Sequence, residues 1–342
     1  MLRVRHYRHG GPEVLRVEEA DVPAPGPGGL LVRVEAVGVT LPAVRKVRGE
    51  GGGGALPGDI GGEVVGRVVD AGPGDEAAGF AVGDRVAAPF AVTGSYAEYA
   101  VVPTRSATAV PRGVDAVRAA ALVRSGQVAS AALDAAGILD PAADAATRPP
   151  ESLLITGAAS GVGHVAVQLA RVRGVRRIVA AVGSPAKAGF VRGLGADEAV
   201  VYPTGAASGG SGAGRAGAGG RADEWDTPVD AVLEGVGGDL VPWALGALAP
   251  GGTMVVFGSG GGHIPAFDLL AGGRTVTGMS MGRQVQADPE RYAANGRHLW
   301  DLVGEGRIRA EVYARFPLRE AHRAHAVIES RANTGKVVLV PD

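Results

Sequence analysis

The clearest chemical signature in the sequence is the glycine-rich stretch SLLITGAASGVGHVAVQLARVRG, residues 152–174. A run of apolar and β-branched residues ends at Thr156, and a helical pattern with its apolar residues on one face begins after Gly163. Backbone N–H groups at the N-terminus of such a helix can hold a pyrophosphate, and small residues permit its close approach. The stretch therefore predicts a strand, a turn and a helix that together bind a dinucleotide.

The spacing of these glycines fits two different fingerprints. Gly157, Gly161 and Gly163 match the TGxxxGxG turn of short-chain dehydrogenases. A GxGxxG turn fits less well, because Ala158 and Ser160 occupy its first two glycine positions. The short-chain interpretation is nevertheless rejected. Those enzymes carry the turn near the N-terminus, whereas about 150 residues precede it here, and none of the six tyrosines has the lysine four residues later that their proton donor requires.

The next strand pattern, in IVAAVGSPAK at residues 178–187, indicates which dinucleotide binds. A site selective for NAD normally ends its second strand with Asp or Glu on the ribose 2′-hydroxyl. Here Gly183, Ser184 and Lys187 follow the strand, without a carboxylate. A small residue, a hydroxyl and a cation suit a 2′-phosphate, so NADPH is favoured over NADH. Ser184 also precedes Pro185 and is predicted to N-cap the next helix; the alternative for Lys187 is a solvated helix residue.

From residue 151 the sequence alternates between strand and helix patterns. The alternation predicts an α/β fold with a doubly wound parallel sheet, in a cofactor domain at residues 122–265. Within this domain, residues 204–224 are so rich in Gly, Ala and Ser that they predict a flexible surface insertion.

The segments on either side of this domain have a different character. Residues 1–121 contain short strand patterns separated by Gly and Pro, which predict an irregular β-barrel or sandwich. Residues 266–342 contain a helical pattern and a final strand, GKVVLVP, and they are predicted to return to the first domain.

The composition excludes several classes of protein. The 342-residue chain has a net charge of −1, so a basic surface for nucleic acid or anionic membrane is not expected. It has no cysteine, which excludes disulfides, thiolate catalysis and cysteine-ligated zinc. The N-terminal residues lack the apolar core of a signal peptide and no apolar run is long enough to span a bilayer, so a cytoplasmic protein is expected.

Ordered motifs along nearly the whole chain resemble the medium-chain dehydrogenase/reductase superfamily, in its zinc-independent quinone oxidoreductase branch, which includes zeta-crystallin. The motifs are GGPEVLRVEEADVPAPGPG, GGEVVGRVVDAG, AVGDRVAA, GSYAEYAVVP, GVGHVAVQLAR, LAPGGTMVVFG and HRAHAVIESRANTGKVVLVP. The resemblance implies a GroES-like catalytic domain with an inserted Rossmann cofactor domain. It also implies a homodimer formed through strands of the cofactor domain.

The resemblance further implies a set of residues that contact the cofactor. They are Gly157, Ser160, Gly161, Val162 and Gly163 at the turn, Ser184, Lys187 and Tyr202 at the 2′-phosphate, Gly235, Val236, Gly258 and Ser259 at later strand ends, and Arg331 near the C-terminus. Gly157 and Ser160 depart from the Ala-Ala-x-Gly-Gly-Val-Gly turn that is usual in this branch.

The zinc-ligand positions of the zinc-dependent relatives are lost in this chain. Those relatives place Cys after a Gly-Val pair and His in a Gly-His-Glu motif, and Thr40 and Gly62 stand at these positions. His322 and His325 lie three residues apart on a predicted helix, but no third ligand is near them in the sequence. A solvated helix face is therefore expected for this pair, and the site is predicted to contain no metal.

Without a metal, hydrogen-bond donors must stabilise the negative charge that hydride transfer builds on a carbonyl oxygen. Thr40 stands where the branch commonly has Asn, and it can still donate a hydrogen bond. Gln127 lies in a stretch where relatives often carry Leu-Thr, and it could also reach the nicotinamide or the substrate. Arg45 or Arg48 could approach a polar substrate. For each of these residues an ordinary packing role is the alternative.

The first functional hypothesis is an NADPH-dependent reductase of a quinone, an enone or a related conjugated system. The second is a biosynthetic relative that reduces or reductively cyclises a polyketide-like intermediate, for example of the polycyclic tetramate macrolactam type. The third is a non-catalytic NADPH-binding protein.

Overall fold

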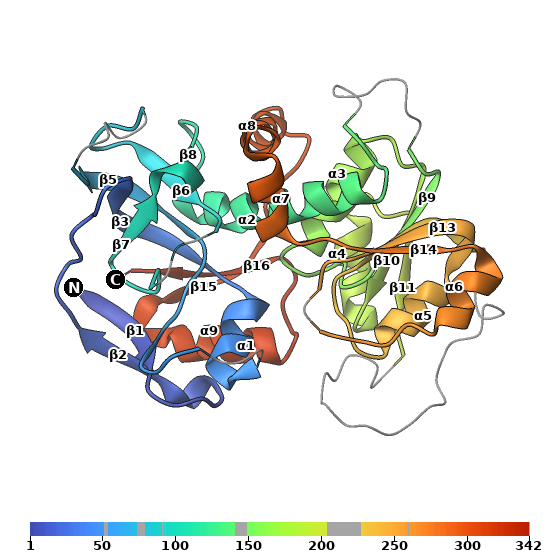
Figure 1. The fold of residues 1–342 in the computed structure, drawn as a ribbon, viewed down its shortest axis with the longest axis horizontal. Coiled ribbons are helices and arrows are strands. Elements are labelled where there is room, and N and C mark those ends of the chain that lie inside the picture. The colour runs from blue at the N-terminus through green and yellow to red at the C-terminus, as the bar shows by residue number, and fades with distance from the viewer. Residues whose placement is uncertain are drawn as a thin grey trace. The chain divides into compact units, whose positions relative to one another are not determined.

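The computed structural model describes residues 1–50, 54–73, 79–90, 92, 94–140, 149–203, 227–258 and 260–341. The predicted insertion at residues 204–224 lies outside these ranges. The chain divides into two compact units (Figure 1). The first contains Met1–Ser125, Gly296–Asp301 and Arg309–Asp342, and the second contains Gly126–Asn295 and Leu302–Ile308. The second unit thus extends beyond residue 265, the boundary predicted from the sequence.

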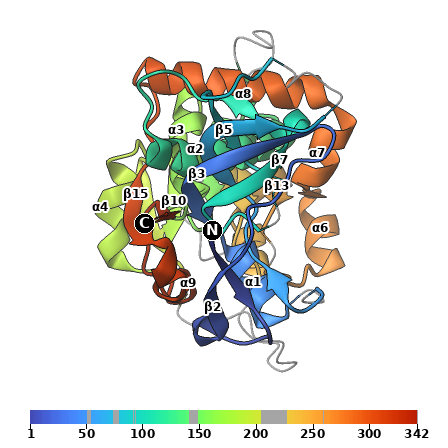
Figure 2. The same cartoon turned by 90° about the vertical axis from the view of Figure 1, so that its left-hand side faces the viewer.

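The first unit is rich in antiparallel β-structure, and both chain ends belong to it (Figure 2). Its larger sheet runs β15 (Val312–Pro317), β16 (Lys336–Val340), β3 (Gly29–Val39), β5 (Val64–Ala71), β6 (Arg85–Ala88) and β8 (Thr108–Ala109), with β7 (Tyr99–Pro103) paired to β3. A smaller sheet runs β2 (Leu15–Glu19), β1 (Leu2–His6) and β4 (Gly58–Asp59). This architecture confirms the predicted β-rich domain.

Helices and 3-10 turns complete this unit. Helix α9 packs against α1 and β16, and buried valines and leucines of the strands form the core. The elements are α1 (Leu41–Arg48), α9 (Ala321–Glu329), η1 (Pro12–Val14), η3 (Thr104–Ser106) and η6 (Leu318–Glu320).

The second unit is built around a six-stranded parallel sheet. Its strands are, in order across the sheet, β11 (Glu198–Val201), β10 (Arg177–Val182), β9 (Ser152–Ile155), β12 (Val229–Glu234), β13 (Leu248–Val256) and β14 (Thr275–Gly278). The connecting elements are α3 (Gly163–Val172), η4 (Pro185–Lys187), α4 (Ala188–Arg192), α5 (Leu240–Gly246) and α6 (Ala266–Gly272). The doubly wound sheet predicted from the sequence is confirmed, and β14 adds an edge strand from beyond residue 265.

The strand order locates the ligand-binding edge of this sheet. From β9 the chain proceeds outward through β10 to β11, and it then returns beside β9 with β12 and proceeds the other way. Right-handed crossovers therefore place α3 and α4 on one face of the sheet and α5 and α6 on the other. The carboxyl ends of β9 and β12 form the switch point where such sheets bind ligands.

The remaining helices are α2 (Ala116–Ala135), α7 (Met281–Ala287) and α8 (Pro289–Gly304). Asp115 caps α2, because its Oδ1 accepts the N–H of Val117 at 3.1 Å and of Arg118 at 3.0 Å. Within the described ranges, no helix combines the length and the apolar character needed to cross a bilayer.

The predicted N-cap at Ser184 is wrong in one respect. This residue precedes η4, but its side chain makes no capping hydrogen bond.

One of the two histidines expected on a solvated face is buried instead. His322 on α9 is exposed, whereas His325 is buried with its Nε2 3.1 Å from the hydroxyl of Tyr96, which is also buried. Burial and the nearby His6 lower the pKa of His325 to about 4. The expectation failed because Tyr96 and β1 meet this helix only in the folded chain.

The His325 side chain should make the protein sensitive to acid. In the unfolded chain it takes up a proton near pH 6.5, but in the folded chain only near pH 4, so the unfolded state binds more protons between these values. The contribution of His325 to the free energy of unfolding should therefore be fully present above pH 6.5. It should fall by about 3 kcal/mol as the pH drops to 4. In His325→Gln, chemical denaturation should show a smaller loss over this range.

The exposed His322 provides the control. His322→Gln should lose stability with acid as the wild type does. An unchanged acid dependence in His325→Gln would show that another group is responsible.

Candidate functional site

The turn after β9 is held by backbone hydrogen bonds and by one side chain. Gly157 has a φ of +58°, a left-handed conformation that suits glycine. The N–H of Ser160 donates to the carbonyl of Gly157 at 2.8 Å, and the N–H of Ala158 donates to Ala181 of β10 at 3.0 Å. The Ser160 hydroxyl accepts the N–H of Gly163 at 3.1 Å. The serine found where a glycine is expected therefore satisfies an N–H group at the start of α3.

Helix α3 approaches this turn so closely that only glycine fits at its first position. A Cβ on Gly163 would lie 2.2 Å from the carbonyl oxygen of Gly157 and 2.7 Å from the Cα of Ala158. The N–H groups of Gly161 and Val162 have no acceptor in the part of the chain that the structure describes. Free N–H groups at the positive end of a ten-residue helix suit an anion such as a pyrophosphate.

The turn after β12 lies against this first turn, and the turn after β13 lies against the turn after β12. Cγ2 of Val236 is 3.0 Å from the position that a Cβ on Gly157 would occupy. A Cβ on Gly258 would lie 2.4 Å from the backbone carbonyl of Gly235. Four residues predicted to contact the cofactor thus meet at the switch point of the sheet. Ser259, predicted with them, lies outside the described residues.

Two polar residues at this edge, Thr156 and Glu234, were missed in the sequence. The Glu234 side chain is fully buried, and its Oε1 accepts the N–H of Val236 at 2.9 Å and of Gly237 at 2.8 Å. The Thr156 hydroxyl contacts the same oxygen at 3.2 Å and accepts the N–H of Gly235 at 2.9 Å. The sequence feature that could have indicated Glu234 is a carboxylate at the end of the apolar run VDAVLE, where the strand ends.

The residues predicted to hold a 2′-phosphate lie after β10 and β11, which are paired. The hydroxyl oxygen of Tyr202 is 3.1 Å from the position of a Cβ on Gly183, so the two residues are in contact. Ser184 and Lys187 lie at the two ends of η4. Burial lowers the pKa of the Lys187 ammonium group from its ordinary value. This corner contains a cation and two hydroxyls, and no carboxylate lies in residues 183–187.

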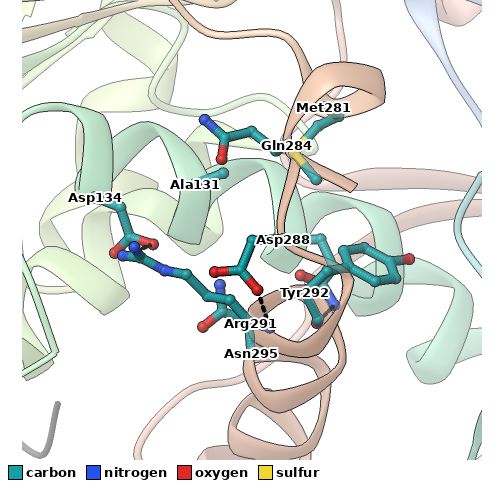
Figure 3. A pocket seen from close by; sticks show the side chains of 9 residues that line it. Ala131, Asp134, Met281, Gln284, Asp288, Arg291, Tyr292 and Asn295 are labelled. Carbon is teal, nitrogen blue, oxygen red and sulfur yellow. Dashed lines mark hydrogen bonds and ion pairs between the residues drawn. The ribbon is translucent and has the colours of Figure 1, made fainter. Parts of the chain in front are cut away.

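Gln127 lies in a different place, on helix α2, where it lines a polar pocket. Figure 3 shows the labelled residues around this pocket. Its Nε2 donates to the backbone carbonyl of Tyr292 on α8 at 3.0 Å, and the side chain is buried. Farther along the same helix, Asp134 forms ion pairs with Arg173 at 2.8 Å and with Arg291 at 2.9 Å. These contacts tie α2 to α3 and α8, which is a packing role. The catalytic role of Gln127 stays a prediction.

The chain matches two family models. Residues 26–112 match the alcohol dehydrogenase GroES-like domain, and residues 161–295 match the zinc-binding dehydrogenase domain. The chain is also 33% identical to a quinone oxidoreductase of Pseudomonas aeruginosa, with 99% of each protein covered. The chain belongs to the quinone oxidoreductase family of medium-chain dehydrogenases and reductases.

Other relatives also match this chain over nearly its whole length. A 2-haloacrylate reductase of a Burkholderia species is 28% identical, with 98% of this chain and 97% of the relative covered. A mycobacterial protein whose structure was solved in complex with NADPH superposes with a TM-score of 0.85, at 31% identity and with both chains fully covered.

In this member of the quinone oxidoreductase family, Thr40 caps a helix. Its Oγ1 accepts the N–H of Ala43 at the start of α1, at 3.3 Å. Nearby, the two arginines considered for substrate contact are paired with carboxylates: Arg45 with Glu50 at 3.3 Å, and Arg48 with Glu329 at 2.6 Å.

Arg331 is the last of the predicted cofactor contacts, and it belongs to the first unit together with Thr40. Arg331, at the end of α9, has a φ of +53°. Arg331 and Thr40 belong to the first unit, and their roles toward a cofactor or substrate stay predictions. Among the described residues, no three His, Cys, Asp or Glu side chains are grouped so that they could hold a metal ion.

The tight contact at Gly163 can be tested by adding a single methyl group. Gly163→Ala should lower the free energy of unfolding by about 1–3 kcal/mol, because the new Cβ meets backbone atoms that cannot move away cheaply. Urea denaturation measures this loss. The matched control is Gly189→Ala in α4, where a Cβ would meet nothing within 4 Å, and where stability should stay the same or rise. Equal behaviour of the two variants would contradict the close approach.

Proposed function

We propose that the chain is an NADPH-dependent oxidoreductase that transfers a hydride, without a metal, to a conjugated carbonyl acceptor such as a quinone or an enone. The observation that carries the proposal is the glycine turn at the switch point, beside a strand that ends in Gly183, Ser184 and Lys187 instead of a carboxylate. The mycobacterial relative with the same fold was solved with NADPH, which supports this cofactor.

The residues present fit this cofactor. The N–H groups of Gly161 and Val162, at the start of α3, would hold the pyrophosphate. Ser184, Lys187 and Tyr202 would hold the 2′-phosphate through two hydroxyls and a cation. When bound, the reduced nicotinamide supplies the hydride.

The proposed acceptor class rests on what relatives are named for. A quinone and a 2-haloacrylate both contain a carbon–carbon double bond conjugated with a carbonyl group. Hydride addition to such a system builds negative charge on the carbonyl oxygen, which a hydrogen-bond donor can stabilise. The Thr40 oxygen accepts one hydrogen bond from Ala43, and its own proton can serve as that donor.

The cofactor assignment predicts a selective loss in Lys187→Ala. Removing a charge-assisted hydrogen bond should raise the Kd for NADPH roughly 10- to 100-fold, while the Kd for NADH stays unchanged. Fluorescence titration measures both constants. Arg192→Ala, which removes an exposed cation from the adjacent helix α4, is the control and should bind NADPH as the wild type does. Equal binding of NADPH and NADH by the wild type would contradict the assignment.

The acceptor is tested by following NADPH oxidation in the presence of quinones, enones and 2-haloacrylates. We expect turnover with at least one of these classes. Tight NADPH binding without turnover on any of them would contradict the proposed reaction and favour a non-catalytic NADPH-binding protein.

We also propose that the chain forms a homodimer through the cofactor unit. Strand β14 is an edge strand with only β13 beside it among the described residues, and edge strands can pair with a second chain. On the preceding helix α6, Phe267 and Leu270 are 73% and 77% exposed. Sedimentation should show a dimer for the wild type and a monomer for the Phe267→Asp/Leu270→Asp variant.

The control for this experiment is Val82→Asp in the first unit, where the valine is 72% exposed and no effect is expected. A monomeric wild type would rule out this dimer.

A further inference from the structure

In the turn after β12, two buried side chains bind the N–H groups of residues 235–237. Glu234 accepts the N–H groups of Val236 and Gly237, and Thr156 accepts that of Gly235. The Thr156 hydroxyl also contacts Glu234, at 3.2 Å, so the two side chains form one unit across neighbouring strands. Their strands are paired in register, with Leu233 beside Ile155 immediately before them.

This arrangement makes the two neighbouring turns chemically different. The turn after β9 leaves the N–H groups of Gly161 and Val162 free among the described residues, so it can bind an anion. The turn after β12 has no N–H group left for a phosphate at residues 235–237. It can present only the apolar Val236 side chain and backbone carbonyls.

The sheet topology assigns each turn to one half of a dinucleotide. A doubly wound sheet consists of two mononucleotide-binding halves, which here are β9 to β11 and β12 to β14. The residues suited to the 2′-phosphate, Ser184, Lys187 and Tyr202, follow strands of the first half, so that half takes the adenosine. The turn at residues 235–237 then belongs to the nicotinamide half.

We propose that Glu234, together with Thr156, is a positioning residue that shapes the turn at residues 235–237 to receive the nicotinamide half of the cofactor. This inference rests on the proposed NADPH dependence. Burying a carboxylate is costly, and Oε2 of Glu234 has no hydrogen-bond donor among the described residues. The structure nevertheless retains this acid, and its bound oxygen fixes a turn in which Gly237 has a φ of +87°.

The test compares two ligands by isothermal titration calorimetry. NADPH contains both halves of the dinucleotide, whereas adenosine 2′,5′-bisphosphate contains only the half assigned to β9 to β11. In Glu234→Ala and in Thr156→Val the Kd for NADPH should rise roughly five- to tenfold, as expected for loss of about one hydrogen bond's worth of preorganisation. The Kd for adenosine 2′,5′-bisphosphate should stay within about twofold of the wild-type value in both variants.

Thr156→Ser is the matched control, because it keeps the hydroxyl and should bind NADPH as the wild type does. If Glu234→Ala does not fold, the comparison of Thr156→Val with Thr156→Ser decides the question alone. Equal weakening of both ligands would show that the two side chains only support the fold, and unchanged NADPH binding in the folded variants would also overturn the inference. A wild-type protein that binds adenosine 2′,5′-bisphosphate and NADPH equally poorly would instead overturn the proposed cofactor.

Discussion

The contact between Gly163 and the carbonyl of Gly157 constrains the whole cofactor unit. It lets the first turn of α3 rest directly on the backbone that leaves β9, which a single Cβ would prevent. Because the helix starts there, the N–H groups of Gly161 and Val162 lie beside the switch point of the sheet. Strands β9 and β12 are paired in register, which places the turns that follow them side by side.

The turns around that contact differ in the hydrogen-bonding state of their polar groups. In the part of the chain that the structure describes, the turn after β9 has N–H donors without an acceptor, whereas Thr156 and Glu234 accept the N–H groups of residues 235–237 in the neighbouring turn. A third corner, after β10 and β11, contributes a cation in Lys187 and the hydroxyls of Ser184 and Tyr202. In the proposed NADPH complex, the three corners would distinguish pyrophosphate, nicotinamide and 2′-phosphate by the hydrogen-bonding state of their polar groups rather than by their glycine content.

The sequence was informative wherever a signal was local. The apolar strand at residues 152–155, the helix that follows and the alternation of strands and helices could all be predicted, because each depends on a short periodic pattern. Strand β14 was missed because its four residues, TVTG, contain little apolar surface and become a strand only beside β13. A local pattern also could not reveal the role of Ser160, which stands where a glycine is expected. Its hydroxyl accepts the N–H of Gly163, and this contact is seen only in the structure.

Other features depended on residues far apart in the chain. His325 is buried because Tyr96, 229 positions away, lies against it. Gln127 is engaged by a backbone carbonyl 165 positions away, so its type alone could not distinguish catalysis from packing. Glu234 ends the apolar run VDAVLE in the sequence, and only the fold shows that its carboxylate is enclosed.

The pairing of β16 with β3 and β15 has a consequence for the order in which the molecule can be completed during synthesis. Strand β16 comes from residues 336–340, and its neighbour β3 comes from residues 29–39. Every strand of the parallel sheet is synthesised between these two. The ribosome therefore releases a complete cofactor sheet while the first unit still lacks a strand of its own sheet, so the unit begun first is the one finished last.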